Sequence, residues 1–273
     1  MSARKSIEQS YDPALEGTGL ASGSYKFARR VMTLLVNTTM RREWIGMEHI
    51  PKTGPVLVAV NHIGHADPAC VALFVNDSGR HPRFMAKAEL MKFPGLTYLM
   101  NDTGQIPVYR DTREAGAALV NAVKRLEADG CVVVYPEGTI TKDPDLWPMR
   151  ARTGIARLFL ATGAPVVPLA QWGPNHLRRH WRPWRRVLVR MAAGPALDLD
   201  RFKGKAATPQ LLDEITDLVI AALRDGVSKL REEPVPSVIW DNRRKTHVPA
   251  DRSDEGDDVT IHEAEPKSGR KSA

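Results

Sequence analysis

Residues 56–68 read Val-Leu-Val-Ala-Val-Asn-His-Ile-Gly-His-Ala-Asp-Pro. The first five are all apolar, with no polar residue between them, which is typical of a strand buried on both faces of a sheet. The pair Asp67-Pro68 then predicts the start of a helix, with Asp67 as its N-cap and Pro68 at its first position. A buried strand, a short loop and a helix in succession indicate an α/β unit.

The same order of strand and helix recurs toward the C-terminus. We predict further strands at 131–135, 166–170 and 187–191, and helices at 112–128, at 153–161 and from residue 208 onward. Gly130 and Gly163 are predicted to end two of these helices, because glycine readily adopts the left-handed conformation of a C-cap. The sequence therefore predicts a single α/β domain, whose mixed, mostly parallel sheet is flanked by helices.

The two ends of the chain differ from this body in composition. Residues 1–23 are polar and rich in Gly and Ser, and residues 236–273 contain few apolar side chains, so we expect both to be disordered. Residues 24–42 are predicted to form an amphipathic helix, because apolar residues recur at helical spacing and basic residues flank them. The predicted domain covers residues 24–235.

The charge of the chain is its unusual property. The 273 residues carry a formal net charge of +7, with a sequence pI near 9.5, although the 26% of charged and 42% of hydrophobic residues are ordinary. That composition excludes a mostly disordered chain and a coiled coil. The basic balance favours an anionic partner, which could be a nucleic acid, a membrane surface or a phosphorylated small molecule.

Cysteine content and hydropathy indicate the compartment. Cys70 and Cys131 both lie in apolar runs and are too few for a disulfide framework or a cysteine-rich zinc site, so we expect buried, reduced thiols. The first twenty residues contain no apolar core of a signal peptide, and no run of 18 apolar residues occurs. We therefore expect a cytoplasmic protein without a transmembrane helix.

The loop after the first strand contains a histidine and an aspartate five residues apart. If Asp67 turns back toward His62, its carboxylate would fix the imidazole tautomer and raise the basicity of the other ring nitrogen, as a general base requires. The alternative role for Asp67 is simple capping of the following helix. His65 is expected to be an exposed loop residue.

Two further segments carry candidate site residues. Residues 135–139, Tyr-Pro-Glu-Gly-Thr, follow the 131–135 strand, so Glu137 could present its carboxylate into a cleft and Gly138 could let a substrate approach the backbone. An ordinary turn is the alternative. Residues 104–110, Gly-Gln-Ile-Pro-Val-Tyr-Arg, end in Arg110, which could hold a phosphate or could be a solvated surface arginine.

Taken in this order, and followed by Val167-Pro168, these motifs resemble the glycerolipid acyltransferase family of the bacterial 1-acyl-glycerol-3-phosphate acyltransferases. The resemblance covers about residues 40–225. It implies that His62 is the base that deprotonates the acceptor hydroxyl and that Asp67 orients it. The hydroxyl oxygen then attacks the acyl thioester directly, so neither cysteine needs a role, and acyl-CoA or an acyl-carrier protein is the co-substrate rather than a bound cofactor.

The resemblance also implies substrate-binding roles for six residues: Asn61, Arg110, Glu137, Gly138, Thr139 and Pro168. Arg110 matches the residue that holds the glycerol phosphate, and Pro168 matches a block on the acyl-donor side.

The chain departs from the family pattern in places. It has Gly64 where the family usually has Ser, and Ile140 and Thr141 where it usually has Arg and Ser. Lys142 or Arg152 could supply the phosphate contact of the missing arginine. A metal site built from the histidines and aspartate of the first motif is possible by residue type. The resemblance explains the same residues without a metal.

Two segments are candidates for contact with a membrane. One is the 24–42 helix, and the other is residues 172–186, which contain three tryptophans among five arginines. Tryptophan with arginine suits the headgroup region of anionic lipid, although the same composition could bind nucleic acid or could pack inward. Given the acyltransferase motifs, we favour an anionic membrane surface over nucleic acid.

The predicted function is transfer of an acyl chain to the free hydroxyl of 1-acyl-sn-glycerol 3-phosphate, which makes phosphatidate for phospholipid synthesis. The enzyme would be cytoplasmic and peripheral on the inner face of the cell membrane. Another lysophospholipid or glycerol 3-phosphate is the alternative acceptor. A basic membrane-binding protein on a decayed acyltransferase scaffold is the non-enzymatic alternative. A serine hydrolase is disfavoured because no Gly-x-Ser-x-Gly motif occurs.

Overall fold

The computed structural model describes residues 23–89, 100, 103–108, 115–174 and 186–251. Its centre is a seven-stranded sheet in the order β1-β7-β6-β2-β5-β3-β4, in which only the β6–β7 pair is antiparallel. The strands are β1 (Met40–Ile45), β2 (Val56–Val60), β3 (Pro82–Lys87), β4 (Ile106–Val108), β5 (Cys131–Val134), β6 (Val166–Trp172) and β7 (Val187–Ala193). The prediction of a mixed, mostly parallel sheet is confirmed.

Strand β2 lies in the middle of the sheet, between β5 and β6. All five of its side chains are buried, as the unbroken apolar run predicted. Because side chains alternate across a strand, Leu57 and Ala59 enter one core cluster while the three valines enter the other. The sheet is therefore covered on both faces, which is the usual state of a parallel sheet.

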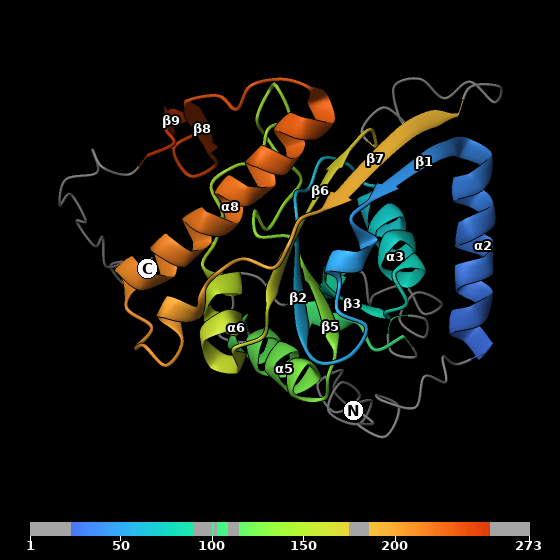
Figure 1. The fold of residues 1–273 in the computed structure, drawn as a ribbon, viewed down its shortest axis with the longest axis horizontal. Coiled ribbons are helices and arrows are strands. Elements are labelled where there is room, and N and C mark those ends of the chain that lie inside the picture. Colours follow the sequence, from blue (N-terminus) through green and yellow to red (C-terminus); the bar gives the residue numbers. More distant parts are fainter. Residues whose placement is uncertain (1–22, 90–99, 101–102, 109–114, 175–185, 252–273) are drawn as a thin grey trace, which may run out of the picture.

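Helices form a layer on each side of the sheet (Figure 1). Helices α2 (Gly23–Thr39) and α3 (Asp67–Asp77) lie on one side, and α5 (Ala115–Glu127), α6 (Gly154–Thr162) and α8 (Pro209–Arg231) lie on the other. Gly163 ends α6 in the left-handed conformation, and the Thr208 side chain accepts a hydrogen bond from the Leu211 amide at the start of α8. Two short 3-10 helices, η2 (Met47–His49) and η4 (Asp200–Phe202), also occur.

Some boundaries differ from the sequence prediction. Residues 40–42 were expected to continue the N-terminal helix, but they begin strand β1, because they pair in parallel with β7. Strands β3 and β4 at the opposite edge were not predicted, because a leading proline and charged residues obscure the first and the second has three residues. Residues 112–114 of the predicted helix lie outside the described residues.

The prediction that disorder begins at residue 236 is wrong. Strands β8 (Val238–Asp241) and β9 (Thr246–Pro249) form an antiparallel hairpin. Its two inward side chains, Ile239 and Val248, face each other in register and are buried in the core cluster beneath α8. Two apolar residues nine positions apart form no periodic pattern in the sequence. Only their pairing across the hairpin shows that both belong to the core. Residues 252–273 lie outside the described residues.

The structure also bears on the two cysteines and on the hydropathy of the helices. Cys70 and Cys131 are both buried and unpaired, and burial raises the pKa of each thiol to about 12. Within the described part of the chain, no helix combines the length and the apolar character needed to cross a membrane.

Candidate active site

The loop between β2 and α3 brings His62 and Asp67 together. The His62 Nδ1 atom lies 2.8 Å from Asp67 Oδ2, and the same oxygen accepts hydrogen bonds from the Ile63 and Gly64 amides at 2.7 and 2.9 Å. Asp67 is fully buried in the first turn of α3, but its side chain does not cap the helix, whose N-cap is Ala66. The predicted N-cap role of Asp67 is therefore wrong, because its carboxylate turns back toward the loop.

This geometry defines the tautomer of His62. A carboxylate that already receives two amide protons is an acceptor, so the imidazole donates from Nδ1 and leaves a lone pair on Nε2. The His62 side chain keeps 17% of its surface exposed, and among the described residues Nε2 makes no hydrogen bond. The pair has the arrangement of a general base and its orienting carboxylate.

A second loop, residues 135–152, fixes the backbone of His62 on both sides. The His62 amide donates to Glu137 Oε1 at 2.8 Å, and the His62 carbonyl accepts from the Thr141 amide at 2.7 Å. Strands β2 and β5 are parallel neighbours, so the loops that leave their carboxyl ends meet. The histidine is therefore held by its main chain as well as by its side chain.

From the sequence, Glu137 was expected to present its carboxylate to a cleft. In the structure it does not. The residue is buried, and its second oxygen accepts from the Met149 amide at 2.9 Å. Burial raises the pKa of this carboxyl to about 8, although the two amide donors lower it. The side chain connects the loop segments around residues 62 and 149.

Aromatic rings cover one face of the His62 imidazole. Tyr135 stacks on it with ring centroids 4.3 Å apart and an interplanar angle of 23°. Phe84 of β3 stacks in turn on Tyr135 at 6.4 Å. This stack restricts rotation of the imidazole and leaves its edge as the route to Nε2.

Asn61 and Pro168 are both buried, although the resemblance implied substrate contact. The Asn61 side chain and the Gln171 backbone exchange two hydrogen bonds, at 3.1 and 2.8 Å, and Gln171 Nε2 donates to the Asn61 carbonyl at 2.6 Å. Pro168 lies within β6, and its carbonyl accepts from the Gly194 amide. Both residues join strands rather than line a surface.

The remaining predicted residues are divided between the site and the surface. Gly138 has a φ of 71°, and a Cβ atom there would meet the Arg152 side chain at 3.4 Å, so Arg152 lies beside this turn. Thr139 is partly exposed, Lys142 and His65 are exposed, and exposure of His65 was predicted. Arg110 lies outside the described residues.

Most of the 172–186 segment also lies outside the described residues, including Trp181 and Trp184. Trp172 is described, and the Arg231 guanidinium lies 4.4 Å from its ring centroid. Within the described ranges, no group of three His, Cys, Asp or Glu side chains could hold a metal ion.

Sequence reasoning missed the roles of three residues that hold the site. Thr141 supports the His62 carbonyl, Tyr135 stacks on the imidazole, and Gln171 pairs with the neighbouring Asn61. Tyr135 and Thr141 lie in or beside the recognised motif, so their positions were visible while their contacts were not. Nothing in the sequence linked Gln171 to residue 61, 110 positions away.

The site therefore consists of a His–Asp pair with the geometry of a general base, at the carboxyl end of the central strand of a mostly parallel α/β sheet. Comparison with known proteins shows a family likeness over part of the chain. The family model "Acyltransferase" matches residues 41–172, which include both loops of the site. The matched segment is just under half of the 273-residue chain, and over that segment the chain is similar to acyltransferases.

Two curated relatives are 1-acyl-sn-glycerol-3-phosphate acyltransferases. The protein from Borreliella burgdorferi is 29% identical over 132 residues, which are 48% of this chain and 51% of the relative. The chloroplastic protein BAT2 from Brassica napus is 27% identical over 134 residues, which are 48% of this chain and 37% of the relative. The chain thus spans about half, or less, of the length of these relatives.

A solved structure has a similar fold. The 1-acyl-sn-glycerophosphate (LPA) acyltransferase PlsC from Thermotoga maritima superposes with a TM-score of 0.55 at 24% identity. The match covers 77% of this chain and 79% of the other. This likeness concerns the fold, and it extends well beyond the segment that the family model matches.

Proposed function

We propose that the protein transfers an acyl chain from a thioester donor to the hydroxyl of a lysophospholipid acceptor, with 1-acyl-sn-glycerol 3-phosphate as the first candidate. The observation that carries the proposal is the His62–Asp67 pair, whose Nδ1–Oδ2 distance is 2.8 Å and whose Nε2 is left for the substrate. Two relatives that match 48% of the chain are named for acyl transfer to that acceptor.

The proposed reaction needs one proton carrier. His62 Nε2 removes the proton of the acceptor hydroxyl as its oxygen attacks the thioester carbonyl. Asp67 stabilises the imidazolium that forms. The tetrahedral intermediate then collapses, the carbon–sulfur bond breaks, and the departing thiolate takes the proton from His62. Acyl-CoA and acyl-carrier protein both supply this thioester, and no cofactor or covalent acyl-enzyme is needed.

The acceptor phosphate requires a cation near the dyad. Arg152 is the described candidate, because it lies beside the Gly138 turn that follows β5. Arg110 stays a prediction for the same task. Lys142 is exposed on the same loop and is the alternative candidate.

Helix α2 is the proposed contact with the membrane. Phe27, Val31, Leu34 and Leu35 are each 50–70% exposed, which is unusual for large apolar side chains on one helix. Basic residues on the same helix suit anionic headgroups. We propose that the enzyme acts at the cytoplasmic face of the cell membrane, where its acceptor is found.

The test is acyl transfer by the purified protein, with labelled acyl-CoA and acyl-carrier protein supplied separately and with a panel of acceptors. The acceptors are lysophosphatidate, other lysophospholipids and glycerol 3-phosphate. We expect His62→Ala to lose activity by about 10²–10⁴-fold, the usual contribution of a general base. His65→Ala is the matched control, because it removes an exposed histidine from the same loop.

Retained activity in His62→Ala would overturn the assigned base. Failure of the wild-type protein to acylate any acceptor, while it still binds anionic vesicles, would favour the non-enzymatic alternative.

A further inference from the structure

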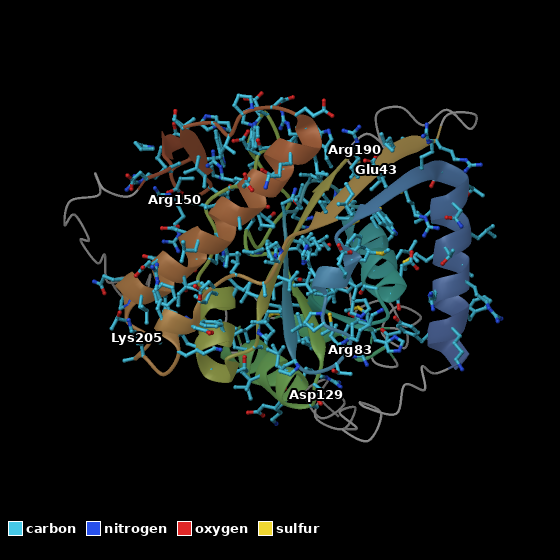
Figure 2. All side chains as sticks on the ribbon, viewed as in Figure 1. Glu43, Arg83, Asp129, Arg150, Arg190 and Lys205 are labelled. Atoms are coloured by element: carbon cyan, nitrogen blue, oxygen red, sulfur yellow. The ribbon has the colours of Figure 1, made fainter. Side chains whose placement is uncertain are left out.

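The β8–β9 hairpin lies outside the segment that matches the acyltransferase family model, yet it is firmly attached to the domain. Figure 1 shows it beside α8. Arg224 of α8 is buried, and one of its guanidinium nitrogens donates to the carbonyls of Pro236 and Val238, both at 2.7 Å. The Arg150 amide of the second site loop donates to the Trp240 carbonyl at 3.0 Å. The hairpin thus contacts both α8 and the 135–152 loop, which bonds the backbone of His62. Figure 2 labels Arg150, which lies at this contact.

One side-chain pair joins the hairpin to that loop. His247 Nε2 lies 3.0 Å from Asp143 Oδ2, and the Asp143 side chain is only 4% exposed. The other Asp143 oxygen accepts from the Asp145 amide at 2.7 Å. The Trp240 ring packs edge-on against the His247 imidazole, with centroids 5.2 Å apart. A buried carboxylate needs such partners, because an unpaired buried charge is costly.

The contacts continue from Asp143 to the catalytic histidine. The Asp143 amide donates to Thr141 Oγ1 at 3.2 Å, and that hydroxyl donates to the Trp147 carbonyl at 2.9 Å. The Thr141 amide donates to the His62 carbonyl at 2.7 Å. An unbroken series of hydrogen bonds therefore runs from the C-terminal hairpin to the backbone of His62.

The loop between them depends on these contacts for its shape. Residues 139–152 contain no helix or strand, so no backbone ladder fixes their conformation. Side-chain bonds from Thr141 and Asp143 replace that ladder. A shift of the loop would move the Thr141 amide, and with it the His62 carbonyl.

We propose that Asp143 and His247 are positioning residues for His62, so that the C-terminal hairpin sets the placement of the base in the site. The expected change in kcat rests on the proposed function, whereas the expected displacement of His62 does not. A displacement of a catalytic group by about 1 Å can cost roughly 10²-fold in rate. Groups outside this loop, including those that bind the acyl donor, would be unaffected.

The kinetic test compares three variants of the full-length protein. We expect His247→Ala to lower kcat by about tenfold to a hundredfold, with the KM for the acyl donor within about twofold of wild type. His247→Gln should recover most of the activity, because its amide can donate to Asp143. Thr246→Ala, at an exposed position one residue earlier on β9, should match wild type.

The geometric test is independent of turnover. In protein labelled with ¹⁵N at its histidines, the ring resonances of His62, assigned with His62→Ala, should shift in His247→Ala and should not shift in Thr246→Ala. Unchanged His62 resonances in His247→Ala would overturn the proposal, and so would an equal loss of kcat in all three variants. If the wild-type protein proves to have no acyltransferase activity, the proposed function fails and the resonance test still decides this inference.

A double variant removes ambiguity about folding. His247→Ala leaves the buried Asp143 carboxylate without its imidazole partner, which could unfold the loop. In Asp143→Asn/His247→Ala the charge is gone, so the protein should fold while the link to the hairpin stays broken. We expect the same loss of kcat and the same shift of His62 in this variant, and wild-type values in it would contradict the proposal.

Discussion

At the scale of single residues, the site depends on the hydrogen bonds that the buried Asp67 carboxylate accepts. Asp67 has no exposed surface, and its Oδ2 atom accepts from the His62 imidazole and from two loop amides. Those amides keep the carboxylate in place before any substrate arrives. The orientation of His62 therefore costs nothing at the moment of reaction, which is the advantage of a preorganised site.

Glu137 gives a residue-scale prediction about pH. Burial raises its pKa in the folded protein to about 8, above the value of 4.5 for an exposed glutamate. Between these two values the folded state holds a proton that the unfolded state releases, so the contribution of Glu137 to stability falls as the pH rises. We expect the free energy of unfolding of wild type, relative to Glu137→Gln, to fall between pH 5 and pH 8, with a slope approaching about 1.4 kcal/mol per pH unit.

Urea denaturation at several pH values measures this difference. Glu48→Gln, at an exposed position, is the control for the loss of one carboxylate. Parallel stability curves for wild type and Glu137→Gln would show that the buried carboxyl does not retain its proton.

At the scale of elements, helix α2 has an apolar face that the described residues leave exposed. Val36 at the C-terminal part of the helix is buried against the α3 side of the sheet, and Tyr25 bonds Asn76 of α3. The apolar residues of the other face point away from the core. An amphipathic helix usually hides its apolar stripe in the core, so an exposed stripe supports the proposed contact with a membrane.

A substitution on that stripe separates membrane binding from folding. We expect Leu34→Glu to reduce flotation with anionic liposomes several-fold, because it places a negative charge where the apolar face and the basic residues would meet the bilayer. Its melting temperature should stay near that of wild type, because Leu34 is 67% exposed. Val120→Glu on α5 is the matched control, since Val120 is 55% exposed on a different helix.

Equal flotation of the two variants would show that α2 is not the membrane contact. Loss of flotation in both would indicate a nonspecific effect of charge.

At the scale of the whole molecule, the packing of α8 on the sheet joins the family-matched domain to the C-terminal part of the chain. The helix packs against β6, and Gly226 is one of the residues of α8 at that contact. A Cβ atom at Gly226 would lie 2.7 Å from the Ala170 Cβ atom. The same helix holds the β8–β9 hairpin through Arg224, so its distance from the sheet affects the positioning of that hairpin.

Gly226→Ala is therefore expected to destabilise the protein, despite the higher helix propensity of alanine. Overpacking costs about 1–3 kcal/mol, whereas alanine gains about 1 kcal/mol in a helix. Gly116→Ala on α5 is the matched control, because no atom of the described residues outside its own stretch of helix lies within 4 Å of the added Cβ atom, and it should stabilise the protein by about 0.5–1 kcal/mol. Urea denaturation measures both, and a Gly226→Ala protein at least as stable as wild type would contradict the close approach.

A second property of the whole molecule is how its charged side chains are divided between internal contacts and the surface. Glu43 of β1 and Arg190 of β7, which Figure 2 labels on neighbouring strands, form an ion pair at 3.3 Å. Several other arginines serve structural purposes, among them Arg80, which bonds the carbonyls of Pro51, Gly54 and Asp129. Part of the net charge of +7 is therefore used inside the fold rather than offered to a partner.

The sequence by itself determined the fold class, the central strand, most of the helices and the His62–Asp67 pair. These features depend on local properties: unbroken apolar runs, helical periodicity, capping residues and a spacing of five positions. They need no knowledge of distant contacts, and the structure confirms them.

Only the tertiary structure decided what the other residues of the motifs do. Glu137 and Asn61 were expected to meet a substrate, but both bond backbone groups that the fold brings next to them from up to 110 positions away. The β8–β9 hairpin likewise exists because Ile239 and Val248 meet across it and enter the core under α8. Such contacts depend on the three-dimensional packing of segments distant in the chain, and no local pattern encodes which buried polar group will find which partner.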